Sequence, residues 1–177
     1  MVLVDQGFVK KSDLPLNLPT VIAGRRAYWS HNMHITRYTD YSLRVLIYLA
    51  ERHQELTTIQ QIAESYDISR NHLMKVVHQL NKKGYIETVR GKKGGMRLRL
   101  SPADINIGVL VRETEQDLSI VECRSNGGNC AIAPVCGLKS MFSEAVDAFL
   151  VTLDKYTLED VIPPAHKAQL LRLLQIA

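Results

Sequence analysis

Long apolar runs are missing from this chain of 177 residues. No stretch reaches the roughly 18 apolar residues that a membrane-spanning helix needs, and the first thirty residues carry no apolar segment behind a basic start of the kind that directs secretion. We therefore expect a soluble, cytoplasmic protein that does not bind a membrane. Nucleophile–base pairs, phosphate-binding glycine loops and paired carboxylates in a recognisable frame are absent as well, so we do not expect an enzyme.

Cysteine is scarce, and all three thiols, Cys123, Cys130 and Cys136, lie within fourteen residues. In a chain without an export signal, clustered thiols bind metal or sense redox more often than they form disulfides. The spacing Cys-x6-Cys-x5-Cys lacks the close pairs that structural zinc sites and ferredoxins use. Three thiolates on a wide loop can instead hold three irons of an iron–sulfur cluster. The fourth ligand would then come from elsewhere in the fold or from a second subunit.

Charges of opposite sign are concentrated in different halves of the chain. Residues 33–100 carry 12 Lys+Arg against 6 Asp+Glu, a balance of +6, whereas residues 101–177 carry 6 against 10, a balance of −4. This distribution favours a polyanion-binding domain followed by a regulatory or oligomerising part, with an ordinary solvated surface as the alternative. Residues 1–32 show no sustained periodicity, and we interpret them as a disordered or non-native extension before a functional start at Met33.

Residues 33–100 have the pattern of a winged helix-turn-helix domain in a mainly α protein. Apolar residues at helical spacing predict helices over about 36–53 and 59–66, and Ser69 is a suitable N-cap for a third helix that ends before Gly84. Residues 85–89 and 96–100 are predicted strands, joined by the basic, glycine-rich loop RGKKGG. The order and the short spacing of these elements are typical of the winged motif.

In such a motif the second helix of the helix-turn-helix lies in the major groove of double-stranded DNA, and its first residues reach the base edges. The side chains that we expect to contact bases or phosphates there are Ser69, Arg70, Asn71, His72 and Lys75. The cations of the wing suit phosphates or a narrow minor groove; they are Arg90, Lys92 and Lys93. The alternative for each cation is a solvated surface charge.

We interpret residues 101–136 as a connector, with a short helix near 107–114, followed by the cysteine loop. Residues 137–177 are interpreted as a dimerisation helix and a C-terminal tail. From Gly137 to Lys155 apolar residues recur at intervals of three and four over about five helical turns. A helix of this length needs a cover, and we favour a homodimer because two-fold dimers read palindromic operators; packing on its own domain is the alternative.

The segment MHITRYTDYSLRVL from Met33, the helix SRNHLMKVV from Ser69, the wing RGKKGG and the three-cysteine loop together resemble the iron–sulfur winged-helix transcriptional regulators, and among them the nitric-oxide-sensing repressors. The resemblance covers about residues 33–162. It implies a homodimer with a cluster in each subunit, with a [4Fe-4S] cluster favoured over a [2Fe-2S] cluster.

The resemblance also implies that the acid early in the first helix, here Asp40, supplies the fourth ligand from the partner subunit. A sister regulator uses a histidine near its cysteines, and this chain has none between His78 and His166. The alternative for Asp40 is an acid that stabilises the helix N-terminus. Arg44, one turn later, is expected to pair with an acid and to tie this helix to the cysteine loop.

A carboxylate is a poor, exchangeable iron ligand beside three thiolates, so nitric oxide could displace it. We therefore expect a dimeric repressor that binds a palindromic promoter site with its cluster intact and releases the site on nitrosylation. Two alternatives remain open. One is a general iron–sulfur status or redox-sensing regulator, and the other is a structural adaptor that holds zinc or free thiols.

Overall fold

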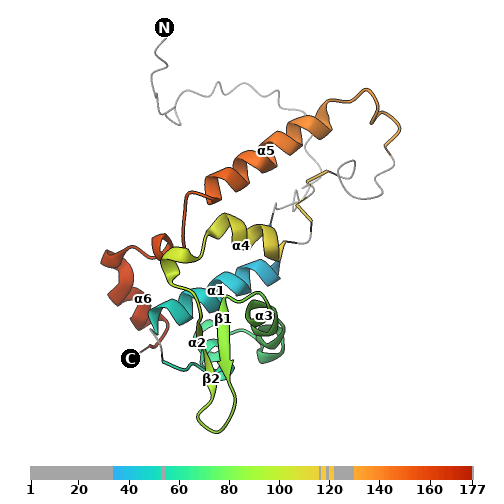
Figure 1. Ribbon diagram of the computed structural model, residues 1–177. Helices are drawn as coiled ribbons and strands as arrows, with labels where there is room; N and C mark the ends of the chain where they lie inside the picture. Colours follow the sequence, from blue (N-terminus) through green and yellow to red (C-terminus); the bar gives the residue numbers. More distant parts are fainter. Residues whose placement is uncertain (1–33, 53–54, 116, 119, 122–129, 177) are drawn as a thin grey trace, which may run out of the picture. The chain divides into compact units, whose positions relative to one another are not determined.

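The computed structural model describes residues 34–52, 55–115, 117–118, 120–121 and 130–176. The extension predicted for residues 1–32 and the predicted ligand Cys123 lie outside these ranges. The described chain is mainly helical with one two-stranded antiparallel sheet, which confirms the predicted fold class (Figure 1). No helix in it is long and apolar enough to cross a bilayer. The elements are α1 Arg37–Glu51, α2 Ile59–Tyr66, α3 Arg70–Lys82, β1 Ile86–Val89, β2 Gly95–Leu98, α4 Ile107–Thr114, α5 Leu138–Leu153 and α6 Lys167–Leu173.

Threonine caps start the first two helices where the sequence predicts them. The hydroxyl of Thr36 accepts a hydrogen bond from the backbone N–H of Thr39 at the start of α1. At the start of α2, Thr58 and Gln61 form a reciprocal capping box. Asp67 then takes a left-handed conformation with φ 51°, which ends α2 and begins the turn into α3.

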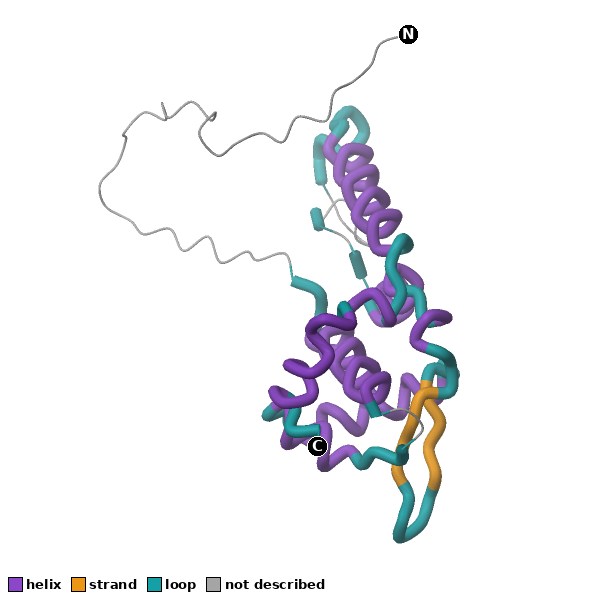
Figure 2. Tube along the Cα trace, turned by 90° about the vertical axis from the view of Figure 1, so that its left-hand side faces the viewer, coloured by secondary structure: helices purple, strands orange, loops and turns teal. Residues whose placement is uncertain are grey.

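The end of α3 and the wing are shaped by glycine. Gly84 has φ +84° and stands just past the helix. Its N–H donates to the carbonyl of Asn81 at 3.1 Å, and the N–H of Tyr85 donates to the carbonyl of Leu80 at 3.0 Å. This pair of bonds is a Schellman motif. Strands β1 and β2 follow in antiparallel register, and their hairpin extends beyond the helices (Figures 1 and 2).

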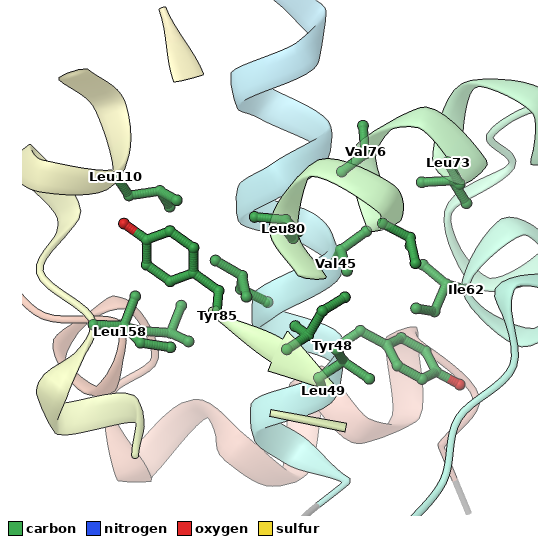
Figure 3. Close-up of a cluster of buried hydrophobic side chains, with 14 of the residues drawn as sticks. Val45, Tyr48, Leu49, Ile62, Leu73, Val76, Leu80, Tyr85, Leu110 and Leu158 are labelled. Carbon is green, nitrogen blue, oxygen red and sulfur yellow. The ribbon is translucent and has the colours of Figure 1, made fainter. Parts of the chain in front are cut away.

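Helix α1 occupies the centre of the hydrophobic core. Figure 3 shows Val45, Tyr48 and Leu49 of α1 among side chains from the helix-turn-helix and from α4. Val45 and Leu46 are fully buried, and Tyr48 is 2% exposed. Burial of each such side chain stabilises the fold by about 1.5–3 kcal/mol. The inner face of α3 consists of four buried residues: Leu73, Val76, Val77 and Leu80.

The C-terminal segment, for which the sequence indicated no role, packs back onto the helix-turn-helix region. Leu174 is 5% exposed, and its carbonyl accepts a hydrogen bond from the hydroxyl of Ser65 in α2 at 2.8 Å. Lys167 of α6 forms an ion pair with Glu51 at the end of α1, with 3.4 Å between Nζ and Oε2. The two ends of the described chain are therefore joined through one core.

A polar clamp joins the end of α5 to α4. The guanidinium of Arg112 contacts both carboxylate oxygens of Asp154, with 2.7 Å between Nη2 and Oδ2. The side-chain amide of Asn106, which caps α4, donates to the carbonyl of Asp154 at 2.7 Å. Gly108 leaves the space for this approach, because a Cβ there would lie 2.8 Å from the backbone nitrogen of Asp154 and closer still to its carboxylate.

We predict that Gly108→Ala forces this clamp apart and lowers the free energy of unfolding by about 1–3 kcal/mol, the usual range for overpacking. Chemical denaturation followed by circular dichroism measures the change. Gly137→Ala is the matched control, because a Cβ at position 137 meets nothing within 4 Å, and its effect should stay within about 0.5 kcal/mol. Equal stability of the two variants would contradict the clamp.

Candidate functional site

The residues predicted to read DNA share one exposed region at the start of α3. Arg70, Asn71, His72 and Lys75 are exposed, because the buried stripe of α3 faces the core on its other side. Ser69 occupies the N-cap position, but its hydroxyl makes no capping hydrogen bond. Its carbonyl instead accepts the first bonds of the helix, so the hydroxyl is left exposed to solvent.

The tip of the wing presents three exposed cations on a loop that only glycine can form. Gly91 has φ +120°, and a Cβ on Gly94 would lie 2.9 Å from the carbonyl oxygen of Gly91. Arg90, Lys92 and Lys93 are all exposed on this loop. No carboxylate within the described ranges forms an ion pair with them, whereas Arg97 in β2 pairs with a glutamate of β1. The loop cations are thus available to an external anion.

Two of the three cysteines lie in the segment that leads into α5. Cys130 is exposed and Cys136 is half-buried, and both are free thiols. Tight turns connect them, with the N–H of Ala133 bonded to the carbonyl of Cys130 at 3.0 Å. Cys136 comes directly before the first turn of α5 and lines an open depression together with side chains of that helix, among them Lys139 and Glu144.

The described thiols are suitable iron ligands, but they do not complete a site. Thiolate is the soft donor that iron–sulfur clusters use, and both Cys130 and Cys136 can supply it. Within the described part of one subunit, however, no three His, Cys, Asp or Glu side chains come together as a metal site. A cluster held by these thiols would therefore need further donors from the residues outside these ranges or from another subunit.

Asp40 is held by Arg44 on the outer face of α1. Nε of Arg44 donates to Oδ1 of Asp40 at 3.1 Å and Nη2 lies 3.0 Å from Oδ2, a two-point contact between side chains that are 41% and 38% exposed, respectively. The guanidinium of Arg44 also lies 5.7 Å from the ring centre of Tyr66. Burial raises the pKa of Tyr66 to about 12, so the ring is a neutral partner for the cation. Arg44 thus pairs with an acid as expected, but that acid is Asp40 itself.

Several polar contacts around this region have no signal in the sequence, because they join residues far apart in the chain. The hydroxyls of Thr39 and Thr114 are bonded in the core, 75 positions apart. The phenol of Tyr85, just before the wing, donates to Glu113 of α4 at 3.0 Å. Burial, and then this bond, raise the pKa of Tyr85. Helical periodicity marks Thr39 and Thr114 only as polar positions, and the fold alone brings them together.

Comparison with known proteins agrees with this architecture. Residues 35–164 match the model of the Rrf2 family, described as an iron-dependent transcriptional regulator. The HTH-type transcriptional regulator NsrR of Bacillus subtilis is 56% identical over 146 residues, which cover 81% of this chain and 99% of that protein. NsrR of Geobacillus kaustophilus is 51% identical over 132 residues, or 73% of this chain and 90% of that protein.

Solved structures show the same fold. T. potens IscR superposes with a TM-score of 0.61 at 25% identity, covering 77% of this chain and 91% of that one. The oxidised form of Staphylococcus aureus CymR gives a TM-score of 0.57 at 29% identity, covering 71% and 93%. The similar proteins in sequence are named as regulators of transcription and not as enzymes.

Proposed function

The chain belongs to the Rrf2 family of transcriptional regulators, and from this premise we propose that it is a dimeric repressor controlled by an iron–sulfur cluster. In the proposal, the protein binds palindromic promoter DNA with the cluster intact and releases it when nitric oxide nitrosylates the cluster. The observation that supports it most is the position of Cys130 and Cys136, two free thiols in the segment of turns just before a helix whose outer face is uncovered.

The DNA contacts follow from the exposed groups. Arg70 can form two hydrogen bonds with guanine, and Asn71 can do so with adenine, in the major groove. The free hydroxyl of Ser69 and the open N–H groups of the first turn suit a phosphate. Lys92 and Lys93 on the wing supply charge that neutralises the backbone of the duplex, which makes binding dependent on salt.

Helix α5 has two apolar faces, and its own subunit covers one. Val146 and Leu150 are 4% and 8% exposed and face the core, where α5 packs against α4. Next to this covered side, Leu138, Met141 and Phe149 are 48%, 65% and 38% exposed. An uncovered apolar stripe of this kind marks an interaction site. A second copy of the same helix is the partner we propose, because it would bring two recognition helices to the two halves of a palindrome.

Thiolates of Cys123, Cys130 and Cys136, with Asp40 from the partner subunit, are the proposed ligands. A bound iron–sulfur cluster would supply iron atoms that react with nitric oxide. Arg44 occupies only part of the Asp40 carboxylate, whose two oxygens offer about four acceptor positions. It can therefore orient that carboxylate toward a metal and hold it after release, as a hydrogen-bonded neighbour of a ligand does.

We predict that protein prepared without oxygen absorbs visible light and contains iron and sulfide. Addition of nitric oxide should then weaken operator binding, measured by fluorescence anisotropy, by at least about tenfold, or about 1.4 kcal/mol.

Asp40→Ala should bind the operator more weakly in the cluster-loaded form, whereas Asp104→Ala, at an exposed acid far along the chain, should not. Cluster-free protein that binds the operator as tightly would refute the switch. Colourless, zinc-containing protein would favour a structural adaptor, and a response to oxygen alone would favour a general redox sensor.

Mutants should distinguish a residue that reads bases from a residue that contacts phosphates. Arg70→Ala is expected to cost about 1–3 kcal/mol on the operator and little on random DNA. Lys92→Ala should weaken binding to both and reduce the salt slope by about one. Lys155→Ala removes an equally exposed charge at the end of α5 and serves as the control. Equal losses of Arg70→Ala on both DNAs would show that Arg70 does not read a base.

The dimer can be tested at Met141. Met141→Glu places a charge in the uncovered stripe and should convert the protein to monomers in analytical ultracentrifugation, because a charge in an apolar interface must be desolvated. Leu173→Glu on α6 is the matched control, since Leu173 is 69% exposed and Met141 is 65% exposed. A Met141→Glu protein that stays dimeric would place the subunit interface elsewhere.

A further inference from the structure

The start of α1 is fastened to the end of α4 by hydroxyl groups. Oγ1 of Thr39 donates to Oγ1 of Thr114 at 2.9 Å, and the Thr114 hydroxyl in turn donates a hydrogen bond to the carbonyl of Leu110 at 2.8 Å. Thr39 is fully buried and Thr114 is 3% exposed. Beside them, the N–H of Thr36 donates to a carboxylate oxygen of Glu115 at 2.7 Å. A buried hydroxyl left without a partner costs about 1–3 kcal/mol, so these two helix ends are expected to move together.

These hydrogen bonds lie close in the sequence to the cysteine segment. Glu115 directly follows α4 and is also hydrogen-bonded through the Thr36 hydroxyl at 3.1 Å. Eight residues later the chain reaches Cys123, the first of the three cysteines. These bonds therefore join the exit from α4 to the N-terminus of α1 within the same subunit.

The same part of α1 also touches the helix-turn-helix. The ring of Tyr41 lies 6.2 Å from the ring of His72, centre to centre, at 33°. His72 is the third residue of α3 and belongs to its exposed first turn. One turn further along α1, Arg44 lies over Tyr66, the last residue of α2. Helix α1 thus contacts the helix-turn-helix on both sides of its turn.

We propose that Thr39 and Tyr41 are positioning residues that connect the cysteine-bearing segment to the recognition helix within one subunit. Thr39 holds the start of α1 to the exit of α4. Tyr41 contacts His72, so a shift of α1 also shifts the His72 side chain. This inference rests on the proposed function and adds a second route to it, because the Asp40 ligand acts between subunits. The contact with His72 is suited to this role, since it bears on an exposed side chain at the DNA-facing end of α3 and not on the core.

The test compares variants that keep or remove each contact. Thr39→Val removes the hydroxyl at nearly constant volume, and Thr39→Ser restores it. Tyr41→Leu removes the ring, and Tyr41→Phe keeps it. The measured quantity is the ratio of operator affinities of cluster-loaded and cluster-free protein. We expect Thr39→Val and Tyr41→Leu to reduce this ratio by about fivefold or more, the lower range of coupling between sites, with iron and sulfide content unchanged. Thr39→Ser and Tyr41→Phe should keep the wild-type ratio.

A second measurement, hydrogen exchange in cluster-free protein, does not depend on the cluster. Thr39→Val should speed exchange of the His72 and Leu73 amides, which bond to the carbonyl of Ser69, and should leave the C-terminal end of α3 unchanged. Thr39→Ser should match the wild type.

The two failures are distinguishable. If wild-type protein binds the operator equally with and without the cluster, the proposed function is wrong. Hydrogen exchange at His72 and Leu73 then decides by itself whether Thr39 and Tyr41 connect the two segments. If the wild-type ratio is large but Thr39→Val and Tyr41→Leu leave both the ratio and the exchange unchanged, the connection is overturned.

Discussion

Packing around α1 is the constraint on which the rest of the structure depends. This helix lies against α3, β2 and α4, and its side chains Val45 and Leu46 are fully buried. Because a close-packed interior transmits displacement and resists deformation, α1 can shift only together with what it touches. The same helix carries Asp40 on its outer face. A group proposed to sense a signal is therefore built on the element that supports the recognition helix.

The second constraint is the distribution of apolar surface on α5. Its own subunit covers one face through Val146 and Leu150, and the bond between Arg112 and Asp154 sets where the helix leaves the domain. The opposite face, with Met141, is left uncovered. A single subunit thus fixes the direction of this helix but leaves part of its apolar surface exposed to solvent. A second copy of the helix could cover that surface.

The candidate site combines local and distant components. Cys130 and Cys136 belong to one short segment of tight turns, so this part of the site is local in the chain. Asp40 lies in another element and is engaged by Arg44 in a single subunit. Arg44 pairs with an acid of its own helix, and the predicted tie to the cysteine loop stays a prediction. The i,i+4 spacing of Asp40 and Arg44 on a predicted helix is a signal for this pair, because residues four apart are neighbours on a helix surface.

Local rules determined much of this protein from its sequence alone. Helix periodicity and the glycine at position 84 are short-range features that predicted their elements correctly, and the spacing of the cysteines predicts a chemistry that can be tested. Tertiary structure decided the contacts between distant residues. The Thr39–Thr114 bond, the ring contact of Tyr41 and the return of the C-terminal segment depend on how helices pack. Such contacts are chosen by the burial of the whole core, and no spacing within the chain encodes them.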